Sequence, residues 1–189
     1  MRLASSRVRT IGLMLGGAWA SLPLAVSAQP GESTAQGVAE AEIVEPLSVH
    51  AVTDLRFGAV AVAPMQSGSV TVPADSGPAS FAGGASAACS GLEACSAGPA
   101  LFTVRGERGR DYSVSLPSEV TAEARDTAGP PLQVTQLSVL SRNRPDGGPE
   151  GRLDDSGMDE VSVGGTLDIP AGTAPGTYAA EVAIVVSYS

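Results

Sequence analysis

The feature that most constrains the fold is a strict two-residue alternation near the end of the sequence. Successive side chains of a β-strand point to opposite faces, so a period of two predicts a strand with one face in a core. A helix would scatter the same residues around its whole circumference. From Tyr178 to Tyr188 every even position is apolar, and Gly176 precedes the run after a Pro175 turn. The alternating residues are Tyr178, Ala180, Val182, Ile184, Val186 and Tyr188.

Short apolar runs between turn-forming residues extend this interpretation to most of the chain. Pro46 predicts an edge or bulged position for the first run. Within 131–141, Leu132 and Val134 share one phase while Leu137 and Val139 share the other, which predicts a bulge. No segment shows a helical stripe, so we predict an all-β, Ig-like antiparallel β-sandwich of about seven strands. The runs lie at 41–52, 54–60, 68–74, 100–107, 111–117, 131–141, 159–170 and 176–189.

The first 28 residues have the pattern of a cleaved signal peptide. Basic residues at Arg2, Arg7 and Arg9 precede an apolar run, and small residues follow it up to Ala28. This three-part pattern predicts cleavage between Ala28 and Gln29. A membrane anchor is the alternative, but the run is short for a span and is interrupted by Pro23 and by glycines. We therefore expect export to the periplasm, the outer-membrane surface or the extracellular space, with no transmembrane span in the mature chain.

The mature chain divides into a polar, Gly-rich leader at 29–38 and one domain at 39–189. Loss of three arginines with the signal peptide would lower the formal net charge from −9 to −12. An acidic chain repels phosphate backbones, so we expect no nucleic-acid partner.

Two features could hold a cross-link or a metal ion. Cys89 and Cys95 lie close together, and in an exported chain an even cysteine count predicts a disulfide. A metal site there is the weaker alternative, because no histidine or further cysteine is nearby. A second set of carboxylates could bind calcium or form a solvated acidic loop, and the spacing of a Ca²⁺-binding EF-hand loop is missing. These are Asp154, Asp155, Asp159 and Glu160.

No motif of nucleophilic, phosphate-binding or zinc-dependent catalysis occurs in the sequence. His50 is the single histidine and lies in an expected strand. Arg105, Arg108 and Arg110 fall in what we expect to be a solubilising hairpin turn. We predict that the protein is not an enzyme and holds no cofactor or metal.

Four motifs, in order, resemble the family of exported bacterial proteins called domain of unknown function 4402. They are "VEPLSV…DLRFG", "GSVTVP", "FTVRGERGRDYSVSLP" and "VSVGGTLDIPAGTAPGTYAAEVAIVVSYS", and the likeness spans about Ala39 to Ser189. The glycines Gly164, Gly165 and Gly176 of the last motif fall where the family pattern has them, whereas the insert around Cys89 departs from it. This family is generally grouped with fimbrial, pilin-like subunits.

The resemblance implies a structural protein that assembles by β-strand addition, in which an exposed sheet edge takes a strand from another chain. Its partners would be further subunits, a periplasmic chaperone and an usher. The end of the chain also looks like the final strand of such pilins, with Tyr188 next to last. Residues 38–49 are either the donated strand or part of their own domain, and we favour the second because Ile43 to Val49 falls at the family's first-strand position. The alternative functions are a monomeric surface-binding module and, more distantly, a secreted hydrolase.

Overall fold

The computed structural model describes residues 36–88 and 96–189, and every regular element in them is an antiparallel β-strand. The all-β prediction is therefore confirmed, although thirteen strands replace the expected number of about seven. The strands are β1 (Ser48–Thr53), β2 (Val60–Val62), β3 (Gly68–Val72), β4 (Ser80–Gly83), β5 (Ala85–Ala87), β6 (Ala100–Arg105), β7 (Asp111–Ser115), β8 (Val120–Ala124), β9 (Leu132–Ser141), β10 (Glu150–Arg152), β11 (Met158–Ile169), β12 (Tyr178–Ala179) and β13 (Val185–Tyr188).

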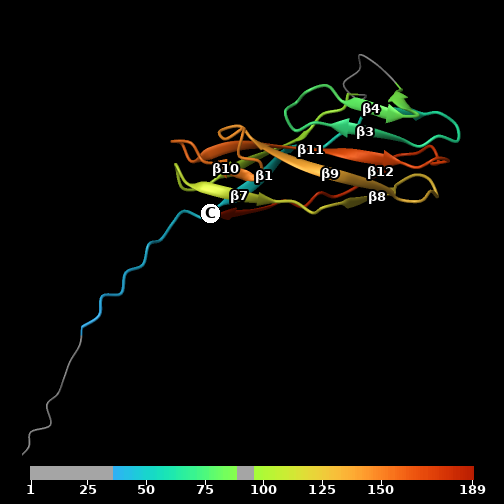
Figure 1. Ribbon diagram of the computed structural model, residues 1–189. Coiled ribbons are helices and arrows are strands. Elements are labelled where there is room, and N and C mark those ends of the chain that lie inside the picture. The colour runs from blue at the N-terminus through green and yellow to red at the C-terminus, as the bar shows by residue number, and fades with distance from the viewer. Residues whose placement is uncertain (1–35, 89–95) are drawn as a thin grey trace, which may run out of the picture. The chain divides into compact units, whose positions relative to one another are not determined.

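The long strand β11 is the centre of the main sheet (Figure 1). One edge of β11 pairs with β9, while the other edge pairs first with β6 and then with β3. Gly164 lies where β6 gives way to β3, and a Cβ there would collide with the carbonyl oxygen of Val72. Only glycine lets β3 approach so closely. The sheet continues outward to β1 beyond β6, β4 beyond β3, and β8 and β12 beyond β9.

A smaller sheet of β10, β7 and β13 forms the second layer of this sandwich-like fold. The main core cluster lies between the layers, because it joins β6 and β11 residues to β7 residues. Its buried members are Val104, Tyr112, Val114, Leu153 and Val161. A second cluster, built on Ala122, Leu132 and Val134, lies on β8 and β9. Burying these apolar side chains is the main stabilising contribution to the fold.

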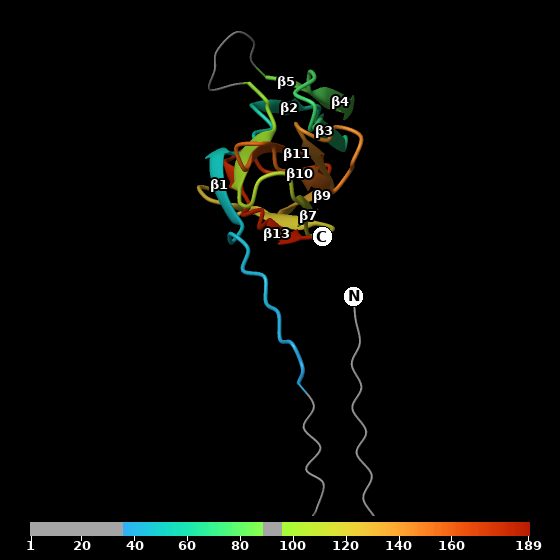
Figure 2. The same ribbon diagram turned by 90° about the vertical axis from the view of Figure 1, so that its left-hand side faces the viewer.

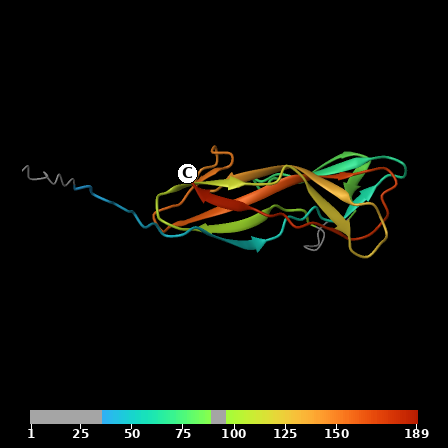
Figure 3. The same ribbon diagram turned by 90° about the horizontal axis from the view of Figure 1, so that it is seen from below.

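The run from Tyr178 to Tyr188 is one extended path that changes sheets along the way (Figures 1 and 3). Its first part, β12, pairs with β8, and its last part, β13, pairs with β7. Residues 180–184 between them form no ladder, and the segment between β7 and β8 is interrupted in the same region. The prediction of one continuous strand of eleven residues is therefore wrong. The run is divided into two strands because its neighbours, β7 and β8, belong to different sheets.

Several other sequence predictions can be compared with the structure. The bulge in 131–141 is confirmed: the β9–β11 register shifts between Gly164 and Thr166, and Gln136 has a φ of 49°. The shift lets both phases of β9 reach the core, since Val134 and Leu137 belong to the same cluster.

Other predictions were wrong. The run 54–60 makes only an isolated bridge from Arg56 to Gly98, and the nearby strand is β2. Residues 106–110 do not close a hairpin, because β6 and β7 lie in different sheets. The strands β4, β5, β8 and β10 were not expected.

Candidate functional site

The even positions of the terminal run face the interior, as the alternation predicted. Ile184, Val186 and Tyr188 pack against the main cluster, and Tyr178 and Ala180 pack against the second. All six even residues, Val182 included, are half-buried, and the odd positions from Glu181 to Ser187 are exposed. The interior face is thus in contact with a core but not sealed from solvent.

The terminal run lies at the edge of both sheets. In the described residues β12 pairs only with β8, and β13 pairs only with β7. At the other end of the main sheet, β1 pairs only with β6 among these residues. Figure 2, which shows the end of the domain that carries the C-terminus, places β1 and β13 next to one another around the core. We call the unpaired sides of β1 and β13 the open edge.

Backbone groups of β13 point into this open edge. Ser189 donates its backbone N–H to the carbonyl of Asp111 at 3.3 Å, in register with the β7–β13 ladder. Facing residues in an antiparallel ladder alternate between hydrogen-bonded and non-hydrogen-bonded pairs. The N–H and C=O groups of Val186 and Tyr188, which are out of phase with Ser189, therefore point away from β7. Unpaired backbone groups of this kind are a template for a further strand.

The side chains beside the open edge are apolar and incompletely covered. Seven partly buried apolar residues surround the main cluster, and five of them come from β13, from β1 or from the residues next to these strands. These five are Leu47, Val49, Ile184, Val186 and Tyr188. Half-exposed apolar side chains along two free strand edges can bury further surface when a strand is added between them.

Tyr188 joins three segments at one end of the open edge. Its hydroxyl donates to the carbonyl oxygen of Glu45 at 2.6 Å and accepts the backbone N–H of Glu107 at 2.7 Å. Gly106 makes room for this contact, because a Cβ there would collide with the Tyr188 hydroxyl. The guanidinium carbon of Arg110 lies 5.8 Å from the centroid of the Tyr188 ring, within the range of a cation–π contact.

Arg110 extends this cluster to the residues that precede β1. Its Nη2 lies 2.8 Å from a carboxylate oxygen of Glu42, and its Nε donates to Glu107 at 2.9 Å. Arg110 is therefore part of a contact between segments, which sequence reasoning missed when it treated the arginines as a solubilising turn.

Gly176 and its neighbours hold the other end of the terminal run. A Cβ at Gly176 would collide with the Thr127 methyl, so glycine is required by close approach. Asp126 accepts the backbone N–H of Thr177 at 2.6 Å and its hydroxyl at 2.9 Å. These two bonds hold the pKa of the Asp126 carboxyl below its ordinary value.

Two of the four acidic residues considered for calcium accept hydrogen bonds from different groups. Asp159 is buried and accepts bonds from the hydroxyls of Tyr112 and Ser141. Asp154 accepts bonds from Ser156 and Met158 in its own turn, which lowers the pKa of its carboxyl. In the part of the chain that is described, no three His, Cys, Asp or Glu side chains gather where they could hold a metal ion.

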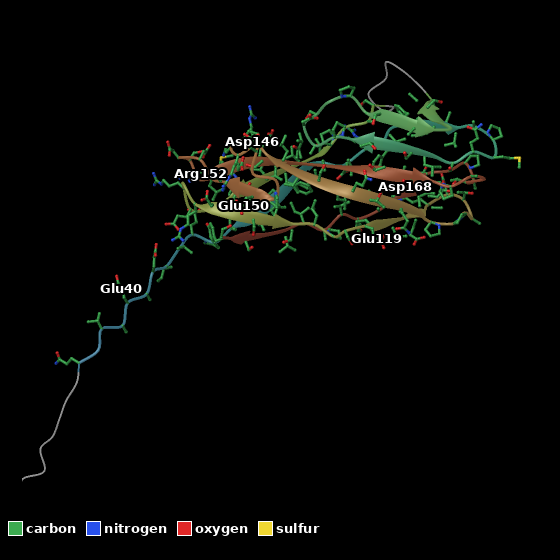
Figure 4. The ribbon with its side chains drawn as sticks, in the orientation of Figure 1. Glu40, Glu119, Asp146, Glu150, Arg152 and Asp168 are labelled. Atoms are coloured by element: carbon green, nitrogen blue, oxygen red, sulfur yellow. The ribbon has the colours of Figure 1, made fainter. Side chains whose placement is uncertain are left out.

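Charged side chains are spread over the domain. Figure 4 shows Asp146, Glu150 and Arg152 together at the end that carries β10, with Asp168 and Glu119 away from them. The remaining predicted positions, Cys89, Cys95, Ala28 and Gln29, lie outside the described residues. Residues 36–47, which contain the last part of the predicted leader, form no regular structure. No helix in the described residues is long and apolar enough to cross a membrane.

Comparison with known proteins identifies the type of domain. The family model described as "Domain of unknown function (DUF4402)" matches residues 47–188, which span β1 to β13 and nearly the whole of the described domain. No curated protein and no solved structure matches the chain.

Proposed function

This chain belongs to the domain of unknown function 4402 family, and we propose that it is an exported, non-catalytic subunit that assembles with further copies by β-strand addition. The observation that carries the proposal is the open edge, where two strands that have no outer partner among the described residues flank a half-covered apolar core. A surface-associated, fimbria-like polymer follows if each subunit completes the edge of the next and the rotation between subunits does not close a ring, because such a head-to-tail contact can then repeat without limit.

The segment before β1 supports a donor role in such a contact. Residues 36–47 lie in no strand, although 41–47 were expected to begin the first one. Val38 is 97% exposed and Ile43 is 96% exposed, so the described residues leave both apolar side chains open to solvent. Ala39, Ala41 and Ile43 alternate with Glu40 and Glu42. A strand with this pattern would present small and apolar residues to the core of a second copy, with its carboxylates outward.

The test is the assembly state of the purified mature protein. We expect ladders that resist SDS and filaments by negative-stain microscopy, and both should disappear when residues 29–41 are deleted. A periplasmic chaperone, if present, should hold the same edge before assembly. A stable monomer at all concentrations would contradict the proposal and would favour the monomeric surface-binding module instead.

A substitution separates the donor role from folding. Because Ile43 is almost fully exposed, Ile43→Ser should change the free energy of unfolding by less than about 0.5 kcal/mol while it weakens assembly. The matched control is Met65→Ser, which removes an apolar side chain that is 91% exposed in a turn elsewhere. Equal assembly by the two variants would argue against donation by this segment.

A further inference from the structure

The open edge is not equally accessible along its length. At the Tyr188 end, side chains connect the two flanking segments through Glu45 and through Glu42. Toward the other end, no hydrogen bond or ion pair among the described residues joins Ser48–Thr53 to residues 180–187. Among the described residues, side-chain contacts therefore join the two sides of the open edge at the Tyr188 end only.

These contacts surround Tyr188, which is one of the residues that an added strand would contact. Arg110 lies against its ring, and the ion pair to Glu42 continues from there to the segment before β1. The hydroxyl of Tyr188 meanwhile holds the backbone of Glu45 within hydrogen-bond distance. A strand that packs over Tyr188 would have to replace these contacts with Glu45 and Arg110.

We propose that Tyr188, Arg110 and Glu42 form an autoinhibitory latch that must open before a strand can be added along the full length of β13. This inference rests on the proposed assembly by strand addition and names its regulation. The latch uses the segment that we propose as a donor, so its opening frees the donor and exposes the acceptor edge together. A subunit would then assemble slowly until contact with a partner displaces residues 42–47.

The contacts of the latch are individually weak, which suits a device that has to open. A single hydrogen bond to a neutral carbonyl contributes little net stability, because the same groups bond to water when the contact opens. The ion pair between Arg110 and Glu42 joins side chains that are 35% and 76% exposed, so solvent and salt screen it. Loss of either contact should therefore accelerate opening by a small factor rather than unfold the domain.

The experiment measures how fast the mature protein takes up a fluorescent synthetic peptide with the sequence of residues 36–47. We expect Tyr188→Phe and Glu42→Gln to take up the peptide about threefold to tenfold faster than the unchanged protein, which corresponds to loss of one latch contact in each variant. Tyr188→Phe also loses the bond from the backbone N–H of Glu107, which lies outside the latch. Uptake by the unchanged protein should also rise with salt, and Glu42→Gln should be less sensitive to salt.

Two controls separate a latch from a general loss of stability. Arg144→Gln removes ion pairs to Glu150 and Asp111 at the same end of the domain, without contact to Tyr188, and should leave uptake unchanged. Tyr112→Phe weakens the core but keeps the latch. If uptake by Tyr112→Phe accelerates as much as by Tyr188→Phe, the effect is global opening and the latch is overturned.

The outcomes distinguish the two proposals. Peptide uptake at the same rate by Tyr188→Phe, Glu42→Gln and the unchanged protein would overturn the latch and leave strand addition standing. Absence of uptake by every protein, latch variants included, would overturn strand addition and the latch with it.

Discussion

Tyr112→Phe tests the polar contact at the centre of the main core. The hydroxyl of Tyr112 donates to Oδ2 of Asp159 at 2.7 Å, and Asp159 is only 4% exposed. Ser141, Asn143 and Glu160 supply the other donors to this carboxylate. A buried carboxylate is tolerated when donors surround it, so removal of one donor should be costly.

The magnitude follows from the charge of the acceptor. Hydrogen bonds to charged groups contribute about 1.5–3 kcal/mol, and the phenyl ring of the variant keeps the packing of Tyr112. We therefore expect Tyr112→Phe to lower the free energy of unfolding by about 1.5–3 kcal/mol, which for a urea m-value of about 1–3 kcal/mol/M moves the midpoint by about 1 M. Trp19 is the only tryptophan and lies in the predicted signal peptide, so far-UV circular dichroism should follow the transition.

The matched control is Tyr178→Phe, whose lost hydroxyl donates to the neutral carbonyl of Ala174 at 2.9 Å. That variant should lose only about 0.5–1.5 kcal/mol. Burial and the bond to Asp159 raise the pKa of Tyr112 well above its ordinary value. The effect of Tyr112→Phe should consequently be constant between about pH 6 and pH 9, where an ordinary tyrosine is also largely protonated. If Tyr112→Phe lowers the free energy of unfolding by no more than Tyr178→Phe, the reasoning from a charged acceptor at Asp159 is refuted.

Three further changes test local features. Because its pKa is lowered, the Asp126 carboxyl stabilises the fold above its ordinary pKa of about 3.9 and loses this effect as the pH falls through the folded value; Asp126→Asn should therefore be less stable at pH 7, with the difference vanishing in an acid urea titration. Gly176→Ala should lower the free energy of unfolding by about 1–3 kcal/mol through overpacking, and Thr127→Ser, which removes the colliding methyl, should restore part of it. Met65 has a φ of 58°, and a left-handed backbone costs an L-residue about 1–2 kcal/mol, so Met65→Gly should match or exceed the original protein in urea; clear destabilisation would speak against strain there.

The interior faces of the strands could be predicted because they follow directly from alternation. The even residues of the terminal run face inward as expected, and the same alternation places Tyr112 with Val114 and Val70 with Val72 in the core. Alternation reports which side chains share a face, but it does not report which strands are neighbours. The division of the terminal run between two sheets therefore required the tertiary structure.

Of the strands that were missed, β4 and β10 lack this pattern, whereas β8 has it in Val120, Ala122 and Ala124. Every residue of β4 is exposed, and β10 is a three-residue strand of Glu150, Gly151 and Arg152 within a turn-rich loop. Such short strands are fixed by backbone pairing to a neighbour and not by burial of alternate side chains. Gly151 shows the constraint most clearly, because a Cβ there would collide with the ring of Tyr112.

The candidate site was predicted in part. The terminal residues were identified from the sequence, and the structure brings them to the core as expected. The open edge was not predictable, because it depends on β1 and β13 lying next to each other without pairing. The contacts of Tyr188 with Glu45 and Glu107 join residues that are far apart in the chain, and only Gly106 and the tyrosine beside the chain end signalled a close approach.

The three partners of β11 have a consequence for the time the chain needs to fold. The pair Gly165–Val72 joins residues separated by nearly half of the sequence, and β6 and β9 are also recruited from upstream segments. Contacts between distant residues require a large loop to close, and the entropy of that closure is lost before the contacts stabilise the chain. Proteins dominated by such contacts therefore fold in about milliseconds to seconds. During that interval the unpaired strands are exposed to aggregation. A chain of this topology would gain from a folding helper that binds its strands before β11 has paired with β9, β6 and β3.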